Sequence, residues 1–212
     1  MPRFSESCRR CARLARHLER VRAQRPDYHA RPVSPFGPEH ARLLVVGLAP
    51  GMHGANRTGR PFTGDHAGIL LYDTLYRFGF SSAPVAISAD DGLRLYRCRI
   101  TNAVKCLPPA NLPRSDEVRR CNGYLRNEIE ALPEGSVILA LGAVAHRAVL
   151  MALKTPGTRF KFSHGARHVP ARGLTLYDSY HCSRYNTQTG RLTPEMFRKV
   201  VTAIAEELSC PA

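Results

Sequence analysis

Four short apolar runs, separated by helical patterns, constrain the fold of this chain more than any other feature of its sequence. The runs are residues 43–49, 98–104, 137–141 and 174–179. Each is typical of a strand that is buried on both faces of a parallel sheet. The helical patterns that follow them cover, to within a few residues, 65–78, 115–131, 143–153 and 194–209. Strands that alternate with helices predict an α/β fold, a three-layer α/β/α sandwich with a central, mainly parallel four-stranded sheet, whose ligand crevice lies outside the carboxyl ends of the strands.

The N-terminal part of the chain predicts a basic helix that an extended connection joins to the core. Between residues 8 and 24, Leu14, Leu18 and Val21 recur at helical spacing among arginines. Prolines then interrupt regular structure, at Pro26, Pro32, Pro35 and Pro38. The length favours one domain, so we expect residues 1–212 to form a single domain in which residues 1–40 are this helix and connection.

The charge of the chain makes a nucleic-acid partner plausible without establishing one. Lys and Arg outnumber Asp and Glu by 31 to 17, which gives a formal net charge of +14. Such a field attracts polyanions, although an arginine-rich composition with no binding role explains the charge equally well. The sequence has no run of 18 apolar residues and no secretory signal at its start. We therefore expect a soluble, cytoplasmic protein that does not bind membranes and acts as a monomer.

Two glycine-rich or polar loops follow the first and the fourth predicted strands. Residues 47–68 contain six glycines and a single acidic residue, and residues 179–193 contain a histidine and two arginines. Glycines allow the backbone to approach a ligand closely. Both loops are expected at the same edge of the sheet, where their polar groups can surround a small planar molecule or a phosphate.

Together with residues 101–106, these loops resemble the uracil-DNA glycosylase superfamily, and within it the thermostable type-B branch, or family five. The resemblance rests on residues 47–51, 59–65, 101–106 and 181–193. It implies a DNA-repair glycosylase that flips a base out of DNA, hydrolyses its N-glycosidic bond and leaves an abasic site. The expected substrates are uracil and, as in type-B relatives, other deaminated bases such as hypoxanthine.

The resemblance places the catalytic acid at Asp65. Most branches of the superfamily carry an acidic or polar residue where this chain has Ala49, and that residue helps to activate water. With alanine there, Asp65 is expected to stabilise the oxocarbenium-like sugar and to orient the attacking water. Asp65 is also well placed to be the N-cap of the helix that follows, and the two roles are compatible.

Three further residues match motif positions with chemical roles. His181 is expected to hydrogen-bond the oxygen of the departing base, and Asn102 to read the base edge or to position water. Phe62 is expected to stack on the base, with an ordinary core phenylalanine as the alternative. Gly47, Ala49 and His53 complete the predicted base-binding set, although His53 fits a solvated loop histidine equally well. Cys182 stands where the family usually has proline, which leaves the shape of this loop less certain than the role of His181.

The segment 184–191 matches the part of the family that enters DNA, with Arg184, Tyr185 and Arg191 as the predicted DNA-binding residues. A second basic stretch is a candidate for sequence-independent phosphate contacts or an ordinary solvated surface, and it consists of Arg159, Lys161, Arg167 and Arg172.

Four of the seven cysteines are predicted metal ligands. Cys8 and Cys11 form a C-x2-C motif, Cys106 follows the second strand, and Cys121 lies inside a predicted helix. Four thiolates suit a zinc ion or a [4Fe-4S] cluster equally well. The resemblance implies a [4Fe-4S] cluster with a structural role, against the alternative of unrelated buried thiols. The remaining cysteines are expected to be unligated and are Cys98, Cys182 and Cys210.

Two other functions remain as alternatives at this point. One is a non-catalytic nucleic-acid-binding iron–sulfur protein of the same fold. The other is an unrelated redox protein with zinc or an iron–sulfur cluster. No lysine in the motifs is an obvious Schiff-base nucleophile, so a monofunctional hydrolase is expected if the chain is a glycosylase.

Overall fold

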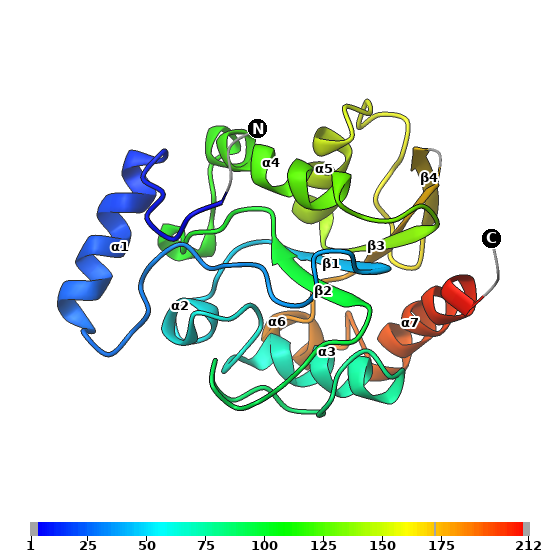
Figure 1. Ribbon diagram of the computed structural model, residues 1–212, viewed down its shortest axis with the longest axis horizontal. Coiled ribbons are helices and arrows are strands. Elements are labelled where there is room, and N and C mark those ends of the chain that lie inside the picture. Colours follow the sequence, from blue (N-terminus) through cyan, green and yellow to red (C-terminus); the bar gives the residue numbers. More distant parts are fainter. Residues whose placement is uncertain (1–3, 172, 210–212) are drawn as a thin grey trace.

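The four apolar runs form the parallel strands of one sheet. In the computed structural model, which describes residues 4–171 and 173–209, they are β1 (Leu43–Gly47), β2 (Cys98–Asn102), β3 (Ser136–Leu141) and β5 (Leu174–Ser179). A fifth strand, β4 (Arg167–Ala171), pairs antiparallel with β5, and the strand order is β2-β1-β3-β5-β4 (Figure 1). The predictions made for Arg172 and Cys210 lie outside the described residues.

The expectation of a four-stranded sheet was therefore short by one strand. Strand β4 lies at the sheet edge, is only partly buried and contains Pro170, which lacks the N–H that a central strand would need. Such a strand has neither the continuous apolar run nor the strict alternation by which a strand is recognised in a sequence. Arg167 belongs to this strand, where the sequence suggested only a basic surface stretch.

All five predicted helices are present, with ends that differ from the predictions by a few residues. They are α1 (Ala12–Gln24), α3 (His66–Arg77), α4 (Ser115–Glu130), α5 (Ala143–Ala152) and α7 (Pro194–Ser209). As predicted, Thr193 precedes α7 and its hydroxyl accepts a hydrogen bond from the Met196 amide at 3.1 Å. Three short helical segments were not predicted, because they are too short to show a helical periodicity of apolar residues. They are α2 (Ala55–Thr58), a 3-10 turn (Pro109–Asn111) and α6 (Arg184–Gln188).

Helices cover both faces of the sheet, which confirms the three-layer α/β/α arrangement (Figure 1). Leu43 and Val45 of β1 pack on the face covered by α3 and α7, whereas Leu44 and Val46 pack on the face covered by α1, α4 and α5. All four side chains are fully buried. This is why β1 is apolar at every position rather than at alternate ones. In the described part of the chain, no helix has the length and apolar content needed to cross a membrane.

Glu207 of α7 binds the edge of the sheet formed by β4 and β5. Its carboxylate accepts hydrogen bonds from the Arg167 guanidinium at 2.8 and 2.9 Å. It also accepts one from the Thr175 hydroxyl at 2.5 Å and one from the Tyr177 hydroxyl at 2.7 Å. The hydrogen bond from Arg167, which outweighs the opposing effect of burial, lowers the pKa of Glu207 to about 2. The charge of Arg167 is therefore paired within the fold.

We expect Glu207→Gln to destabilise the protein by about 2 kcal/mol at pH 7, because hydrogen bonds to a charged group are lost. A carboxyl whose folded pKa lies below its ordinary value of 4.5 contributes stability above that value and loses it as the pH falls towards 2. The difference in Tm between wild type and variant should thus be constant above pH 5 and shrink between pH 4.5 and 2. Glu206→Gln, at the exposed neighbouring position, is the control. A Tm difference that does not change with pH would contradict the prediction.

Candidate active site

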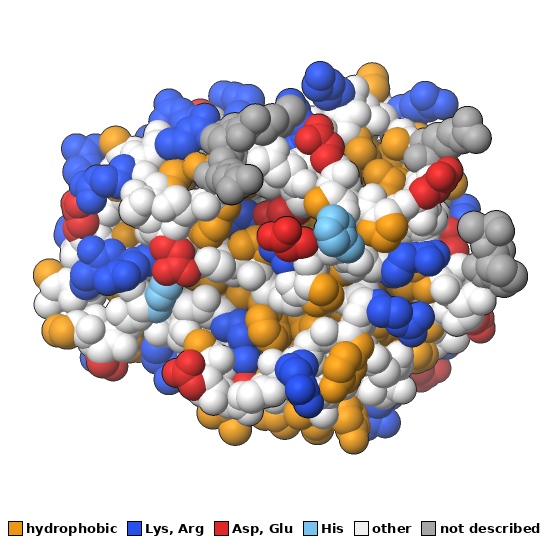
Figure 2. Space-filling model, viewed as in Figure 1, with side chains coloured by type: hydrophobic (Ala, Val, Ile, Leu, Met, Phe, Trp, Pro, Cys, Tyr) orange, Lys and Arg blue, Asp and Glu red, His pale blue; other side chains and the backbone are white. Residues whose placement is uncertain are grey.

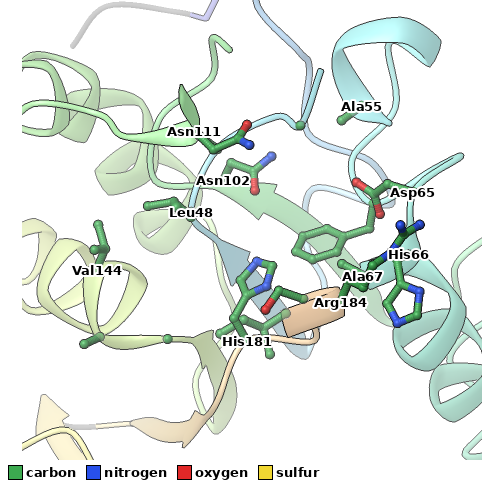
Figure 3. Close-up of a pocket in the computed structure, with 17 residues that line it drawn as sticks. Leu48, Ala55, Asp65, His66, Ala67, Asn102, Asn111, Val144, His181 and Arg184 are labelled. Atoms are coloured by element: carbon green, nitrogen blue, oxygen red, sulfur yellow. The ribbon is translucent and has the colours of Figure 1, made fainter. Parts of the chain in front are cut away.

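A cavity of about 470 Å³ opens at the carboxyl edge of the sheet, where the sequence predicted the ligand crevice (Figure 3). Its walls come from the segments that follow β1, β2, β3 and β5. Six of the predicted site residues line it, and they are Ala49, Phe62, Asp65, Asn102, His181 and Arg184. Residues more than 130 positions apart in the sequence are thus brought to one site.

Asp65 is both a helix cap and part of the cavity wall. Its Oδ1 accepts a hydrogen bond from the Gly68 amide at 3.0 Å at the start of α3. Its other oxygen faces the glycine loop, where a Cβ on Gly54 would lie 2.3 Å from Oδ2. Burial raises the pKa of Asp65, and the amides of Gly68 and Ala67 oppose this effect. The carboxylate is therefore a stronger base than a solvated aspartate, and the helix N-terminus holds it in place.

His181 contributes a neutral imidazole to the cavity. Its ring stacks on the ring of Phe62, with 5.7 Å between centroids and 28° between planes. Its main-chain carbonyl accepts a hydrogen bond from the Asn186 amide group at 2.9 Å, which anchors the loop after β5. Burial lowers the pKa of His181 to about 4. At neutral pH the ring therefore offers one N–H donor and one acceptor.

Gly47 allows Asn102 and Phe62 to meet at the end of β1. A Cβ at position 47 would lie 2.4 Å from Asn102 Oδ1 and 2.6 Å from Phe62 Cζ. Asn102 is only 4% exposed, but its side-chain polar atoms are not among the fully buried atoms that lack a hydrogen-bond partner. The amide lines the cavity, so its donor and acceptor positions are suited to a ligand there. Figure 3 shows Asp65, Asn102 and His181 around the same space.

His53 lies outside this cavity. Its Nδ1 is 2.8 Å from the Tyr28 hydroxyl, and the two rings meet edge to face. It borders a neighbouring groove of about 590 Å³ that shares Asp65, His66 and Arg184 with the main cavity. Of the two expectations for His53, its exposure favours the solvated loop histidine.

The predicted DNA-binding loop forms α6 and the turn that follows it. Arg184 borders both the cavity and the groove, and Tyr185 is 69% exposed. The guanidinium of Arg191 lies over the ring of Tyr180, 4.7 Å from its centroid. A contact of 2.8 Å between His66 Nε2 and Thr187 Oγ1 joins α6 to α3. Exposed cationic and aromatic side chains are thus held at the mouth of the cavity.

Several wall residues were not among the predicted site residues. Gly142, Ala143 and Val144 follow β3 at the same sheet edge, so the rule that placed the other three loops also applied to this segment. Asn111 lies on the 3-10 turn, and its positive φ of 55° comes from a local turn. No periodicity indicates such a turn, and only its Pro-Pro prefix was a signal.

The four predicted ligand cysteines come together beside the segment that follows β2. Cys8, Cys11, Cys106 and Cys121 line one small cavity, and none of them forms a disulfide. Cys8 Sγ accepts a hydrogen bond from the Tyr124 hydroxyl at 3.3 Å, and Cys121 Sγ accepts one from the Lys105 amide at 3.4 Å. Burial raises the pKa of the Cys106 thiol, and it raises that of Cys121 to about 11. Buried thiols of this kind become thiolates only with a cation to bind them.

The spacing of these sulfurs is wider than a single zinc ion requires. Four thiolates around zinc lie about 3.8 Å apart, given a Zn–S bond of about 2.3 Å. In residues 4–171 and 173–209, the one group of three or more potential ligands with all atoms within 4.8 Å of one another contains no cysteine. The four cysteines are therefore not grouped this tightly in the described structure.

Basic side chains are distributed widely over the surface. Figure 2 shows Lys and Arg over the end of the molecule formed by α1 and along other borders of this face, with Asp and Glu side chains scattered among them. The formal net charge is +14. The fold therefore presents a broad positive field in addition to the arginines beside the cavity.

Comparisons with known proteins agree with the geometry. Residues 34–205 match the uracil DNA glycosylase superfamily. The type-5 uracil-DNA glycosylase of Thermus thermophilus is 48% identical over 92% of this chain and 91% of the relative. That of Pyrobaculum aerophilum is 44% identical over 96% of this chain and 90% of the relative. A type-4 uracil-DNA glycosylase of Thermotoga maritima is 28% identical, with 96% of this chain and 94% of the relative covered. The type-5 relatives confirm the branch that Ala49 indicated.

We expect NMR titration to find the His181 imidazole uncharged from pH 8 down to about 5, and half protonated near pH 4, because burial disfavours its cation. Phe62→Ala removes the stacked ring and admits water, so it should raise the pKa of His181 towards the ordinary value of 6.5. A wild-type pKa for His181 of 6.5 or higher would show that the ring is a cation in the free protein.

Proposed function

This chain belongs to the uracil-DNA glycosylase superfamily, and on that premise we propose that it removes uracil from DNA by hydrolysing the N-glycosidic bond. The product is an abasic site. One observation carries the proposal, namely that Asp65, Asn102 and His181 lie around a single cavity that also contains Phe62. A protein that only bound nucleic acid would have no need of a buried carboxylate and an uncharged histidine in one cavity.

In this proposal, base flipping brings uracil into the cavity from the DNA stack. Phe62 supplies a flat apolar surface for the pyrimidine ring, and Asn102 supplies one donor and one acceptor for its edge. The position of Asn102 in the cavity wall supports this role. Insertion of the base next to Phe62 requires a shift of His181, whose ring now stacks there.

Asp65 is proposed to act on the water and on the sugar. Departure of the base gives the deoxyribose an oxocarbenium-like charge, which a nearby carboxylate stabilises. The same carboxylate orients the water and accepts its proton, a task favoured by the raised pKa of Asp65. Ala49 lies in the same wall and cannot perform either task, which supports the assignment of both to Asp65.

His181 is proposed to stabilise the departing base. Bond cleavage leaves negative charge on a uracil oxygen, and an N–H donor in a cavity from which the bound base excludes water stabilises such charge strongly. The low pKa of His181 keeps the ring neutral at working pH, so it acts as a hydrogen-bond donor rather than as a general acid. No lysine lines the cavity in the described part of the chain, which supports hydrolysis without strand cleavage.

The breadth of the substrate set follows from the cavity wall. Ala49, Leu48 and Val144 present small or apolar surfaces, and the volume of about 470 Å³ exceeds what a pyrimidine needs. A purine such as hypoxanthine is therefore proposed as a second substrate.

The DNA around the flipped nucleotide is proposed to contact Arg184, Tyr185 and Arg191. Tyr185 is the aromatic residue of the three and is 69% exposed, and Arg191 lies over the ring of Tyr180. We further propose that the chain acts as one domain, as a monomer and inside the cell, where this substrate occurs.

Cys8, Cys11, Cys106 and Cys121 are proposed to hold a [4Fe-4S] cluster. Their location on one cavity and their lack of disulfides support a shared metal group, and membership of the superfamily favours the cluster over zinc. When bound, the cluster supplies cross-links rather than catalysis, since hydrolysis needs no electron. The four cysteines join the start of α1, the chain after β2 and helix α4. These cross-links hold the segment that begins with Asn102.

Asp65→Asn should lower the single-turnover rate of uracil release by about 100-fold or more, because a general base and a stabilising charge are lost. Asparagine is an equally good N-cap, so the fold and DNA binding should be retained. The assay scores alkali-labile sites in oligonucleotides with one uracil, and a hypoxanthine substrate tests the breadth. Asp73→Asn, on the solvated side of α3, is the control.

The outcomes separate the two levels of the proposal. A wild type that produces no abasic sites from uracil, in single or double strands, would refute the function. Full activity in Asp65→Asn would refute only the role of Asp65.

Anaerobically purified protein should contain about four irons and four sulfides per chain. Cys121→Ala should lose them and lower the Tm, because cluster binding is coupled to folding. Cys98→Ala, at a buried cysteine in the other core, should retain both. Zinc in place of iron in the wild type would overturn the cluster assignment.

A further inference from the structure

Two histidines and an aspartate meet behind the wall of the cavity, in a cluster that the glycosylase mechanism does not use. Asp178 of β5 is fully buried, and its Oδ1 lies 2.8 Å from His146 Nδ1 of α5. Its Oδ2 lies 3.0 Å from His168 Nε2 of β4. One potential ligand atom from each residue lies within 4.8 Å of the other two, a spacing that no other His, Cys, Asp or Glu group in residues 4–171 and 173–209 has.

We propose that His146, His168 and Asp178 form a binding site for a divalent transition-metal ion of the zinc type, separate from the cysteine site. Two imidazole nitrogens and one carboxylate oxygen are ligands that zinc, cobalt and nickel prefer. Three protein ligands leave a fourth position for water. Binding replaces the protons on the two nitrogens that face Asp178, and these protons pass to solvent.

The surroundings of His146 match those of a metal-bound histidine. Its second nitrogen, Nε2, lies 3.1 Å from the carbonyl oxygen of Phe160. Histidines that bind metals usually donate their other N–H to a carbonyl or carboxylate, which fixes the ring. Here both nitrogens face acceptor oxygens, so the position favours positive charge.

The cluster is buried, and in the described structure its most exposed side is that of His168. The side chains of His146 and Asp178 are 2% and 0% exposed, whereas that of His168 is 12% exposed at the sheet edge. The ring of Phe162 packs against His146, and that of Phe160 packs against His168. An ion would therefore reach the site past His168 and would then be shielded from competing water.

The position of the cluster gives the ion a structural task. It would join α5, β4 and β5 and hold the loop that carries Phe160 and Phe162. Helix α5 begins directly after Gly142 of the cavity wall, and Asp178 precedes His181 by three residues. The ion would therefore stiffen two sides of the cavity, although its binding does not depend on the proposed glycosylase function.

Zinc titration by calorimetry tests the site in the purified protein with its cysteine-bound group in place. Chelator is dialysed away first, and iron is measured before and after, so that the cysteine site is accounted for. Wild type should bind one equivalent of zinc that is lost in His168→Gln and in Asp178→Asn. Loss of a ligand should weaken that binding by more than the roughly 10–100-fold typical of a residue that only supports a ligand. Zinc should also raise the Tm of wild type.

The matched control is His164→Gln, which changes a histidine of the same loop that contacts Ser179 and Tyr180 instead. It should retain the equivalent of zinc. The same stoichiometry and affinity in wild type and His168→Gln would overturn the proposal, and so would equal losses in His164→Gln. Should the variants fail to fold, wild type decides alone, because no zinc-dependent rise in Tm and no binding heat at constant iron content also overturn the proposal.

Discussion

The close approach of Phe62 and Asn102 to the α-carbon of Gly47 is the contact on which the cavity depends. A strand of parallel sheet normally ends with a side chain that fills the space above it. Here the missing side chain leaves that space to an aromatic ring from one loop and an amide from the next strand. Phe62 adopts a positive φ of 54° to reach it, and Gly68 leaves room for its carbonyl. The strained backbone of Phe62 persists because the surrounding core fixes both loops.

The sequence offered two interpretations of Asp65, a helix N-cap and a catalytic acid. A cap needs one carboxylate oxygen, and the glycine loop leaves the second oxygen uncovered beside the cavity. Helix dipole and amide hydrogen bonds stabilise the charge, whereas burial opposes it. A residue that begins a helix is also rigid, since its rotamer is fixed by the helix it caps. Structural and chemical roles therefore depend on one another at this position.

How much could be predicted depended on whether a feature leaves a periodic or chemical trace in the sequence. The four parallel strands and five long helices were predictable because both faces of β1 or one face of α7 are apolar at regular intervals. The cavity residues Asp65, Asn102 and His181 were found because each lies in a motif that resembles those of the superfamily, although Asn102 is the last residue of β2 rather than part of a loop. Strand β4 and the turn at Asn111 were not, because β4 is partly buried at the sheet edge and the positive φ of Asn111 belongs to a single local turn, and neither feature leaves a periodic pattern. The cluster around Asp178 was missed because its members lie on three elements with no shared motif.

The segment between Asn102 and Cys106 is short, and main-chain hydrogen bonds fix it along its whole length. The amides of Ala103 and Val104 donate to the carbonyls of Gly47 and Leu48 at 2.9 and 3.0 Å, and the Lys105 carbonyl accepts from the Val33 amide at 2.7 Å. Asn102 at one end lines the cavity and Cys106 at the other lies with the other three cysteines, so the length of this stretch is fixed. An inserted or deleted residue would turn one end away from its site, whatever side chain it carried. The number of residues in this stretch therefore matters more than their side chains, because it keeps Asn102 in the cavity wall while Cys106 stays beside the other three cysteines.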